Sequence, residues 1–165
     1  MRENLSIPDL DLQENIREIR ERVGLAAEKS GRLEKDIAIM AVTKTVPAQR
    51  VNQAIGCGLT LLGENRVQEY LEKYPFYRRK DCSIHFIGRL QTNKVKYIVD
   101  KVDMIESVDR VSLAKEIEKR CGIANKKMDV LLEVNIAGEE SKGGLPISEV
   151  YSAAEAALGM PNVRV

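Results

Sequence analysis

A lysine follows a short apolar run and is the residue of this chain best placed to do chemistry. The run is Ile37–Lys44, with Lys44 as its last residue, and Pro47 follows shortly after. Burial lowers the pKa of a lysine, and a neutral amine condenses with an aldehyde or ketone to form an imine. Lys44 is therefore a candidate Schiff-base lysine. The alternative is a lysine whose methylenes cover a strand end while its amine stays in water.

Other polar residues follow or interrupt apolar segments further along the chain. They are Glu64 and Asn65, His85, Ser107 and Asp109, Glu133 and Asn135, and Lys142 in the loop 138–144. Each has a structural alternative to a role in a site. Asn65 can cap a helix, His85 can be a hydrogen-bonded core residue, and Lys142 can belong to a solvated turn. Glu133 lies inside an apolar segment and needs a cation or donor nearby, because an unpaired buried carboxylate is costly.

The elements that position these residues follow from two alternating periodicities. Residues 9–29 carry one apolar stripe at helical spacing, which predicts an amphipathic helix. The predicted strands are 37–44, 60–64, 83–87, 103–107 and 128–136, with a sixth beginning in 162–165. The predicted helices are 47–58, 66–73, 111–120 and 148–158, with Asn65 and Asp109 as N-caps and Gly122 and Gly159 at two carboxyl ends.

Strands that alternate with helices, without a hairpin signal between them, predict an α/β fold with a parallel sheet. Both a (β/α)8 barrel and an open doubly wound sheet fit this pattern, and in both the ligand site lies at the carboxyl ends of the strands. The usual glycine-rich nucleotide fingerprints are absent, which favours the barrel. Residues 1–165 carry no linker, so we expect one domain.

Composition narrows the classes of partner. The chain has 165 residues, 44% of them hydrophobic, and a formal net charge of +1, which offers no field for nucleic acid or an anionic membrane. Three widely spaced cysteines are typical of free thiols in a reducing compartment, and the start lacks an apolar signal core. We therefore expect a cytoplasmic protein without nucleic-acid or membrane partners.

Two weaker motifs do not change this interpretation. Cys82 and His85 have Cys-x-x-His spacing, but the other cysteines are distant and no second histidine exists, so no metal site is predicted. The basic segment 78–81 follows aromatic residues, as in some nucleic-acid binders. A solvated loop before the third strand explains it more simply.

Five segments together resemble one protein family. They are Ala41–Thr45, Gly63–Glu69, His85–Gly88 with Leu90-Gln91 and Asn93-Lys94, Ser107–Arg110, and Val134–Ile136 with Ser141–Gly144. In this order they resemble the pyridoxal phosphate homeostasis proteins, which are similar to the barrel domain of alanine racemase. The resemblance covers nearly the whole chain from Ile37 on.

The resemblance implies a TIM-type (β/α)8 barrel, the fold type III of pyridoxal 5'-phosphate (PLP) proteins, with PLP held as a Schiff base on Lys44. Asn65, His85, Asn135 and Lys142 match further family positions around the cofactor, and Lys142 is a candidate for cofactor transfer to apo enzymes that use PLP. It also implies a cofactor carrier or regulator without an established reaction. Racemases take part of their active site from a second domain, and this chain has no length for one.

The chain departs from the family at its carboxyl end. Five strand-helix units and the start of a sixth strand are expected, whereas an eight-stranded barrel takes at least ~200 residues. The segment expected to be missing carries the family's phosphate-binding loop, so we assign no phosphate ligands and expect weakened PLP binding. An open sheet with apolar edges also predicts poor solubility or self-association.

Two other functional classes stay open. One is a PLP-dependent amino-acid racemase, and the other is a barrel aldolase that uses Lys44 directly on a carbonyl substrate. Borohydride reduction with PLP or with a keto sugar, followed by mapping of the adduct, separates the aldolase from the two PLP-binding classes. Optical inversion of single-enantiomer alanine in the presence of PLP identifies the racemase.

Overall fold

The computed structural model describes residues 7–139 and 141–165. Its helices are α1 (Ile7–Lys29), α2 (Ala48–Gly56), α3 (Val67–Lys73), α4 (Val95–Ile98), α5 (Val111–Ala124) and α6 (Ile147–Leu158). Its strands are β1 (Met40–Val42), β2 (Leu61–Glu64), β3 (Ser83–Phe86), β4 (Met104–Val108), β5 (Met128–Leu132), β6 (Val134–Asn135), β7 (Leu145–Pro146) and β8 (Val163–Arg164). Short 3-10 helices are η1 (Glu34–Asp36), η2 (Tyr74–Phe76), η3 (Arg79–Asp81) and η4 (Thr92–Lys94).

Six of the strands form one sheet in the order β1-β2-β3-β4-β5-β8, and every neighbouring pair is parallel. Strands that are adjacent in this order follow one another along the chain, with β6 and β7 in a separate small sheet. The order never reverses, as it does in doubly wound sheets. The prediction of a partial (β/α) barrel is confirmed.

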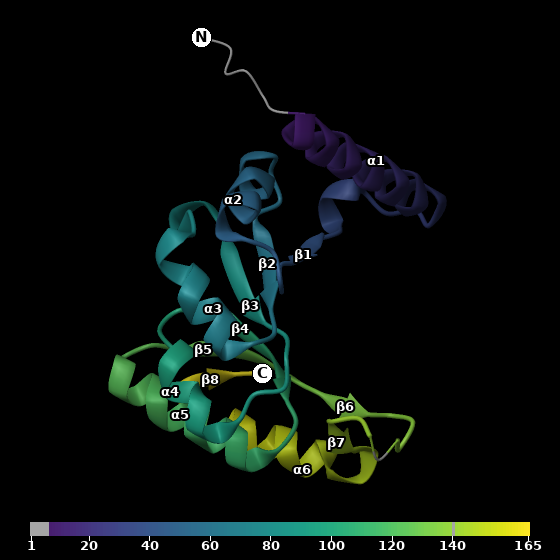
Figure 1. The fold of residues 1–165 in the computed structure, drawn as a ribbon. Helices are drawn as coiled ribbons and strands as arrows, with labels where there is room; N and C mark the ends of the chain where they lie inside the picture. Colours follow the sequence, from purple (N-terminus) through teal and green to yellow (C-terminus); the bar gives the residue numbers. More distant parts are fainter. Residues whose placement is uncertain (1–6, 140) are drawn as a thin grey trace.

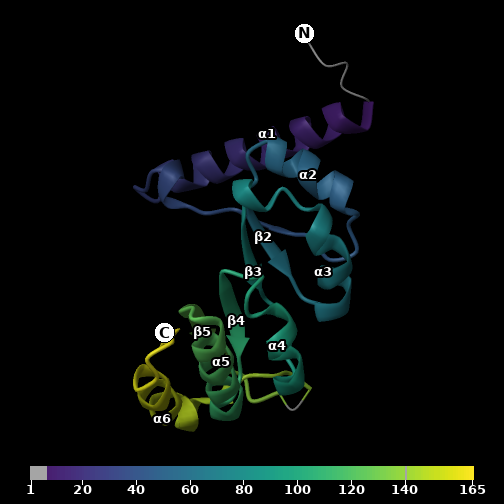
Figure 2. The same cartoon turned by 90° about the vertical axis from the view of Figure 1, so that its left-hand side faces the viewer.

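Helices follow the outer face of the curved sheet, as Figures 1 and 2 show for α2, α3, α4 and α5. The main core lies between these helices and the strands. It contains fully buried residues from alternate strand positions, such as Ile84 and Phe86 in β3 and Ile105 in β4. The opposite face of the sheet, here called the inner face, is more open: Val42 and Leu131 are each about half exposed.

Two predicted strands are wrong in extent. Residues 37–39 and 43–44 of the predicted strand 37–44 lie outside β1, because β1 is an edge strand of the described sheet and pairs only with the short β2. The predicted strand 128–136 is split at Glu133 into β5 and β6. A register shift between Ile105 and Val108 bends the β4–β5 pair. After β5 the chain no longer pairs with β4, and β6 pairs with β7 instead.

Two predicted N-caps are also wrong. Arg66 and Arg110 are the N-cap residues of α3 and α5, and neither helix has a side-chain cap hydrogen bond. Helix α5 continues past Gly122 to Ala124 and ends at Asn125, which adopts a left-handed conformation with φ of 49°. Gly159 does end α6, as predicted. The sequence analysis also missed β7 and the one-turn helix α4.

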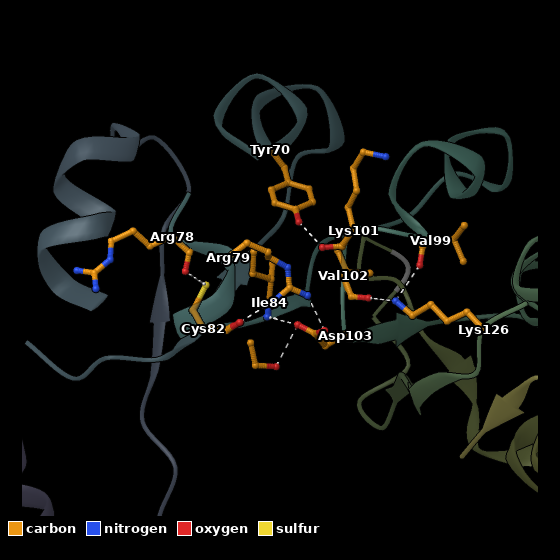
Figure 3. Close-up of polar contacts among 11 residues, drawn as sticks. Tyr70, Arg78, Arg79, Cys82, Ile84, Val99, Lys101, Val102, Asp103 and Lys126 are labelled. Carbon is orange, nitrogen blue, oxygen red and sulfur yellow. Dashed lines mark hydrogen bonds and ion pairs between the residues drawn. The ribbon is translucent and has the colours of Figure 1, made fainter. Parts of the chain in front are cut away.

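A polar cluster joins β3 and β4 at their amino ends, opposite the expected site (Figure 3). Asp103, just before β4, accepts a hydrogen bond of 2.7 Å from the Ile84 backbone N–H and pairs with Arg79 at 2.6 Å. Burial acts to raise the pKa of Asp103, but these donors outweigh it and the pKa is lowered. Nearby, Lys126 donates to the carbonyls of Val99 and Val102, which follow α4.

Within the described ranges, no helix is both long and apolar enough to cross a membrane.

Candidate functional site

Lys44 is the second residue after β1 and lies in the turn that leads to α2, at the carboxyl edge of the sheet. Its side chain is exposed, and among the described residues its amine has no ion-pair partner. Burial therefore does not act on this amine, and in this respect the structure matches the alternative of a lysine whose amine stays in water. The reason is topological, because β1 is an edge strand and the described sheet puts no neighbour on its other side. An aldehyde in solution can reach this amine.

Asn65 follows β2 at the same edge. Its Oδ1 atom is buried without a hydrogen-bond partner in the described structure. The backbone of Asn65 packs closely against Gly88 after β3, where a Cβ atom on Gly88 would lie 2.2 Å from the Asn65 carbonyl oxygen. Asn65 is thus an unpaired acceptor beside a tight loop contact, and it does not cap α3.

His85 lies on the inner face of the sheet, because its neighbours Ile84 and Phe86 are buried on the helix side. Its Nδ1 atom lies 2.5 Å from Glu106 Oε1 on the adjacent strand β4. Both side chains remain partly exposed, at 17% and 25%. Since a partner on one ring nitrogen fixes the orientation of an imidazole, Glu106 holds His85 in place with its other nitrogen free to meet a ligand.

An ion pair continues this inner face toward β8. Arg164 binds Asp129 through both carboxylate oxygens, and Asp129 lies beside Met104 in the β4–β5 register. The hydrogen bond from Arg164 is the main reason that the pKa of Asp129 is lowered, and the nearby His85 adds to it. The inner face therefore carries ionisable side chains on β3, β4, β5 and β8.

Asn135, the last residue of β6, and Lys142, in the loop after β6, both contact Glu139. Asn135 donates to the Glu139 carbonyl at 2.9 Å and accepts from the Glu139 N–H at 3.3 Å, which closes a turn. Lys142 pairs with the Glu139 carboxylate at 2.7 Å. Both residues line a hollow of about 360 Å³ together with Glu133. The amide of Asn135 is thus occupied within its own loop.

Glu133 is half-buried, and the structure gives its carboxylate no cation among the described residues. The expected partner for a buried Glu133 is therefore not found, because the break between β5 and β6 leaves this residue open to solvent. Its backbone is paired on both sides, with the N–H donating to Val108 and the carbonyl accepting from Leu145.

Loops at the carboxyl edge are joined by Arg110. This side chain pairs with Asp109 and donates to the Leu90 carbonyl and the Thr92 hydroxyl, each at 3.1 Å. Asp109 is largely buried and also faces Arg89 at 4.0 Å. The loop after β4 and the loop after β3 are thereby fixed to each other.

The five predicted site residues all belong to the carboxyl half of the sheet or to the loops beyond it, but they do not form one contact network. Within the described part of the chain, no hydrogen bond or ion pair joins Lys44, Asn65, His85, Asn135 and Lys142 to one another. Asn135 and Lys142 line the same hollow. Three strands separate β1 from β5 in the sheet order, so Lys44 and the Asn135 loop lie toward opposite edges.

Sequence reasoning missed Glu106 and Asp129 as neighbours of His85, and Arg164 as the partner of Asp129. A signal for Glu106 and Asp129 was present, because strand alternation places every second residue on the same face. The pairing of Asp129 with Arg164 needed the strand order, which periodicity alone does not give.

Comparison with known proteins gives the family. Residues 10–165 match the family model of the alanine racemase N-terminal domain. A pyridoxal phosphate homeostasis protein of Aquifex aeolicus is 46% identical over 152 residues, covering 92% of this chain and 67% of the relative. The chain belongs to the pyridoxal phosphate homeostasis protein family. A family member from Escherichia coli K12 is 31% identical over 158 residues, and the chain covers 68% of it. The chain thus spans about two thirds of the length of these relatives.

Solved structures agree with this assignment. The crystal structure of an unknown protein from Bifidobacterium adolescentis has a TM-score of 0.90 at 29% identity, covering 99% of this chain and 71% of that one. PipY of Synechococcus elongatus, solved with PLP bound, has a TM-score of 0.74 at 28% identity, covering 89% of this chain and 67% of PipY.

Proposed function

We propose that this chain binds PLP in the cytoplasm as a Schiff base on Lys44 and takes part in PLP homeostasis. The observation that carries this proposal is an accessible lysine at the carboxyl end of the first strand of a family barrel. A relative of this family, PipY, has been solved with PLP bound. PLP supplies two groups: an aldehyde, which reacts with an amine, and a ring that withdraws electrons.

The residues present fit such a group. Lys44 supplies a reachable amine, and Asn65 Oδ1 supplies a buried acceptor that lacks a partner in the described structure. His85, oriented by Glu106, offers a ring nitrogen on the inner face. These side chains would bind and orient the cofactor.

We further propose that the cofactor is passed on to apo enzymes that use PLP, with Lys142 assisting its release. Lys142 is 65% exposed and held by Glu139 in the loop after β6, so it can meet a departing aldehyde or a partner protein. Its amine belongs to the same carboxyl side of the sheet as Lys44.

Borohydride trapping tests the proposal. The chain is incubated with PLP, reduced and digested, and the modified peptide is identified by mass. Label on Lys44 in the wild type, lost in Lys44→Ala and kept in Lys115→Ala, is the expected result, because Lys115 is an exposed lysine on the distant helix α5. Label spread over exposed lysines, or trapping by a keto sugar in place of PLP, contradicts it.

A further inference from the structure

The turn that carries Lys44 is fixed on both sides by side chains from α3. The carbonyl of Thr43, before the lysine, accepts a hydrogen bond of 2.9 Å from Lys73 Nζ. The backbone N–H of Thr45, after the lysine, donates to Glu69 Oε1 at 2.5 Å. Thr45 has a φ of 62°, a left-handed conformation that β-branched residues rarely adopt. Such a conformation persists only where surrounding contacts hold it.

One ammonium joins these contacts. Lys73 Nζ lies 2.8 Å from Glu69 Oε1 and 2.9 Å from Glu64 Oε1. The Lys73 side chain is 11% exposed, and the Glu64 side chain is fully buried. The hydrogen bond from Lys73 is the main reason that the pKa of Glu69 is lowered, which keeps this carboxylate charged. Lys73 therefore links both ends of the turn through charge-assisted bonds.

Glu64 connects this group to the rigid sheet. Its Oε1 atom accepts hydrogen bonds from the hydroxyl of Thr43 at 2.7 Å and from the hydroxyl of Tyr77 at 2.5 Å. Burial and the bond to Glu64 raise the pKa of Tyr77, so its hydroxyl stays a donor at neutral pH. Because Glu64 is the last residue of β2, its contacts attach the turn to the sheet and not to a loop.

Lys44 itself is exposed, so its own side chain contributes little to its placement. The backbone on either side must then set where the amine begins. We propose that Lys73 is a positioning residue for Lys44, holding the Thr43–Thr45 turn so that the amine meets the PLP aldehyde. This inference rests on the proposed function. An amine displaced by about 1 Å reacts on the order of 10- to 100-fold less well with a bound partner.

The test compares variants of the whole chain by PLP titration, borohydride trapping and amide hydrogen exchange. Lys73→Met removes the ammonium with little change in length and is expected to weaken adduct formation on Lys44 by about tenfold or more. The Thr45 amide should exchange faster in this variant, with or without PLP. Lys73→Arg should restore part of the adduct, and Lys115→Met on α5 should behave as wild type. Far-UV circular dichroism monitors the fold of each variant.

A second pair of variants keeps the inference testable if Lys73→Met does not fold. Glu69 is 22% exposed and contacts Thr45 without touching the buried Glu64. Glu69→Gln keeps an acceptor for the Thr45 N–H and should retain most of the adduct, whereas Glu69→Leu should lose it and speed exchange at Thr45.

The outcomes separate the two proposals. If the wild type forms the adduct on Lys44 and folded Lys73→Met or Glu69→Leu forms as much of it, the role of Lys73 is overturned and the proposed function stays intact. No adduct on wild-type Lys44 overturns the proposed function and the role of Lys73 with it. Faster exchange at Thr45 with an unchanged adduct shows a merely structural contact and also overturns the positioning role.

Discussion

Replacing Gly88 by alanine should be one of the most damaging single-methyl additions near the site. A Cβ atom there would lie 2.2 Å from the carbonyl oxygen of Asn65 and 2.6 Å from its Cα atom. An ordinary contact is about 3.5 Å, so the shortfall is about 1.3 Å. Because the obstructing atoms are backbone, they cannot turn aside as the end of a side chain can. The loop after β2 or the loop after β3 must move.

The expected cost is at the upper end of the range for overpacking, about 3 kcal/mol. For a domain of this size each kcal/mol lowers the melting temperature by about 2–4 °C, so a shift of about 6–12 °C is expected. Thermal unfolding followed by circular dichroism measures it. Since Asn65 is displaced, the affinity for PLP measured by titration should fall as well.

Two other glycines provide a graded series. At Gly63 the nearest atoms to an added Cβ are Met40 Sδ at 2.7 Å and Ile87 Cδ1 at 2.9 Å, both ends of flexible side chains. Gly63→Ala should therefore cost less, about 1 kcal/mol. At Gly143 the nearest atoms are 3.8 Å away, and Gly143→Ala should be close to neutral. A Gly88→Ala protein as stable as Gly143→Ala would refute the steric reasoning.

Three further predictions concern other parts of the chain. The pKa of Asp103 is lowered in the fold, so its contribution to stability is present above the unfolded pKa of about 3.9 and is lost as pH falls through the folded pKa. Urea unfolding should thus give Asp103→Asn a lower free energy of unfolding than the wild type at pH 7, by about 1 kcal/mol at most because the pair with Arg79 is partly exposed. This difference should shrink near pH 3, and an equal difference at both pH values would contradict the reasoning. Burial lowers the pKa of Lys126, so the folded chain binds fewer protons than the unfolded chain between that value and about 10.4, and stability should rise with pH there. In Lys126→Met this rise should flatten, and an identical pH profile would argue against it. Finally, Lys142→Ala loaded with PLP should release it more slowly to an apo enzyme than Lys115→Ala, and equal release rates would remove Lys142 from transfer.

The amino-acid sequence by itself indicated the alternation of strands and helices, apart from α4, β7 and the break between β5 and β6, and the placement of polar residues at strand ends. Apolar periodicity is a local property, and it located β2 to within one residue. It also predicted a strand in 162–165, where Val163 and Arg164 form β8 and pair with β5. Parallel pairing also followed, because helices between strands leave no other simple connection.

Only the tertiary structure decided what surrounds each functional side chain. The exposure of Lys44 follows from the edge position of β1, and the split at Glu133 follows from the bend between β4 and β5. The contacts of Lys73 with Thr43 and Glu64 join residues 30 and nine positions apart. Such contacts depend on how a helix packs beside the ends of two strands. A local pattern of residue types does not predict which distant residues this packing brings together.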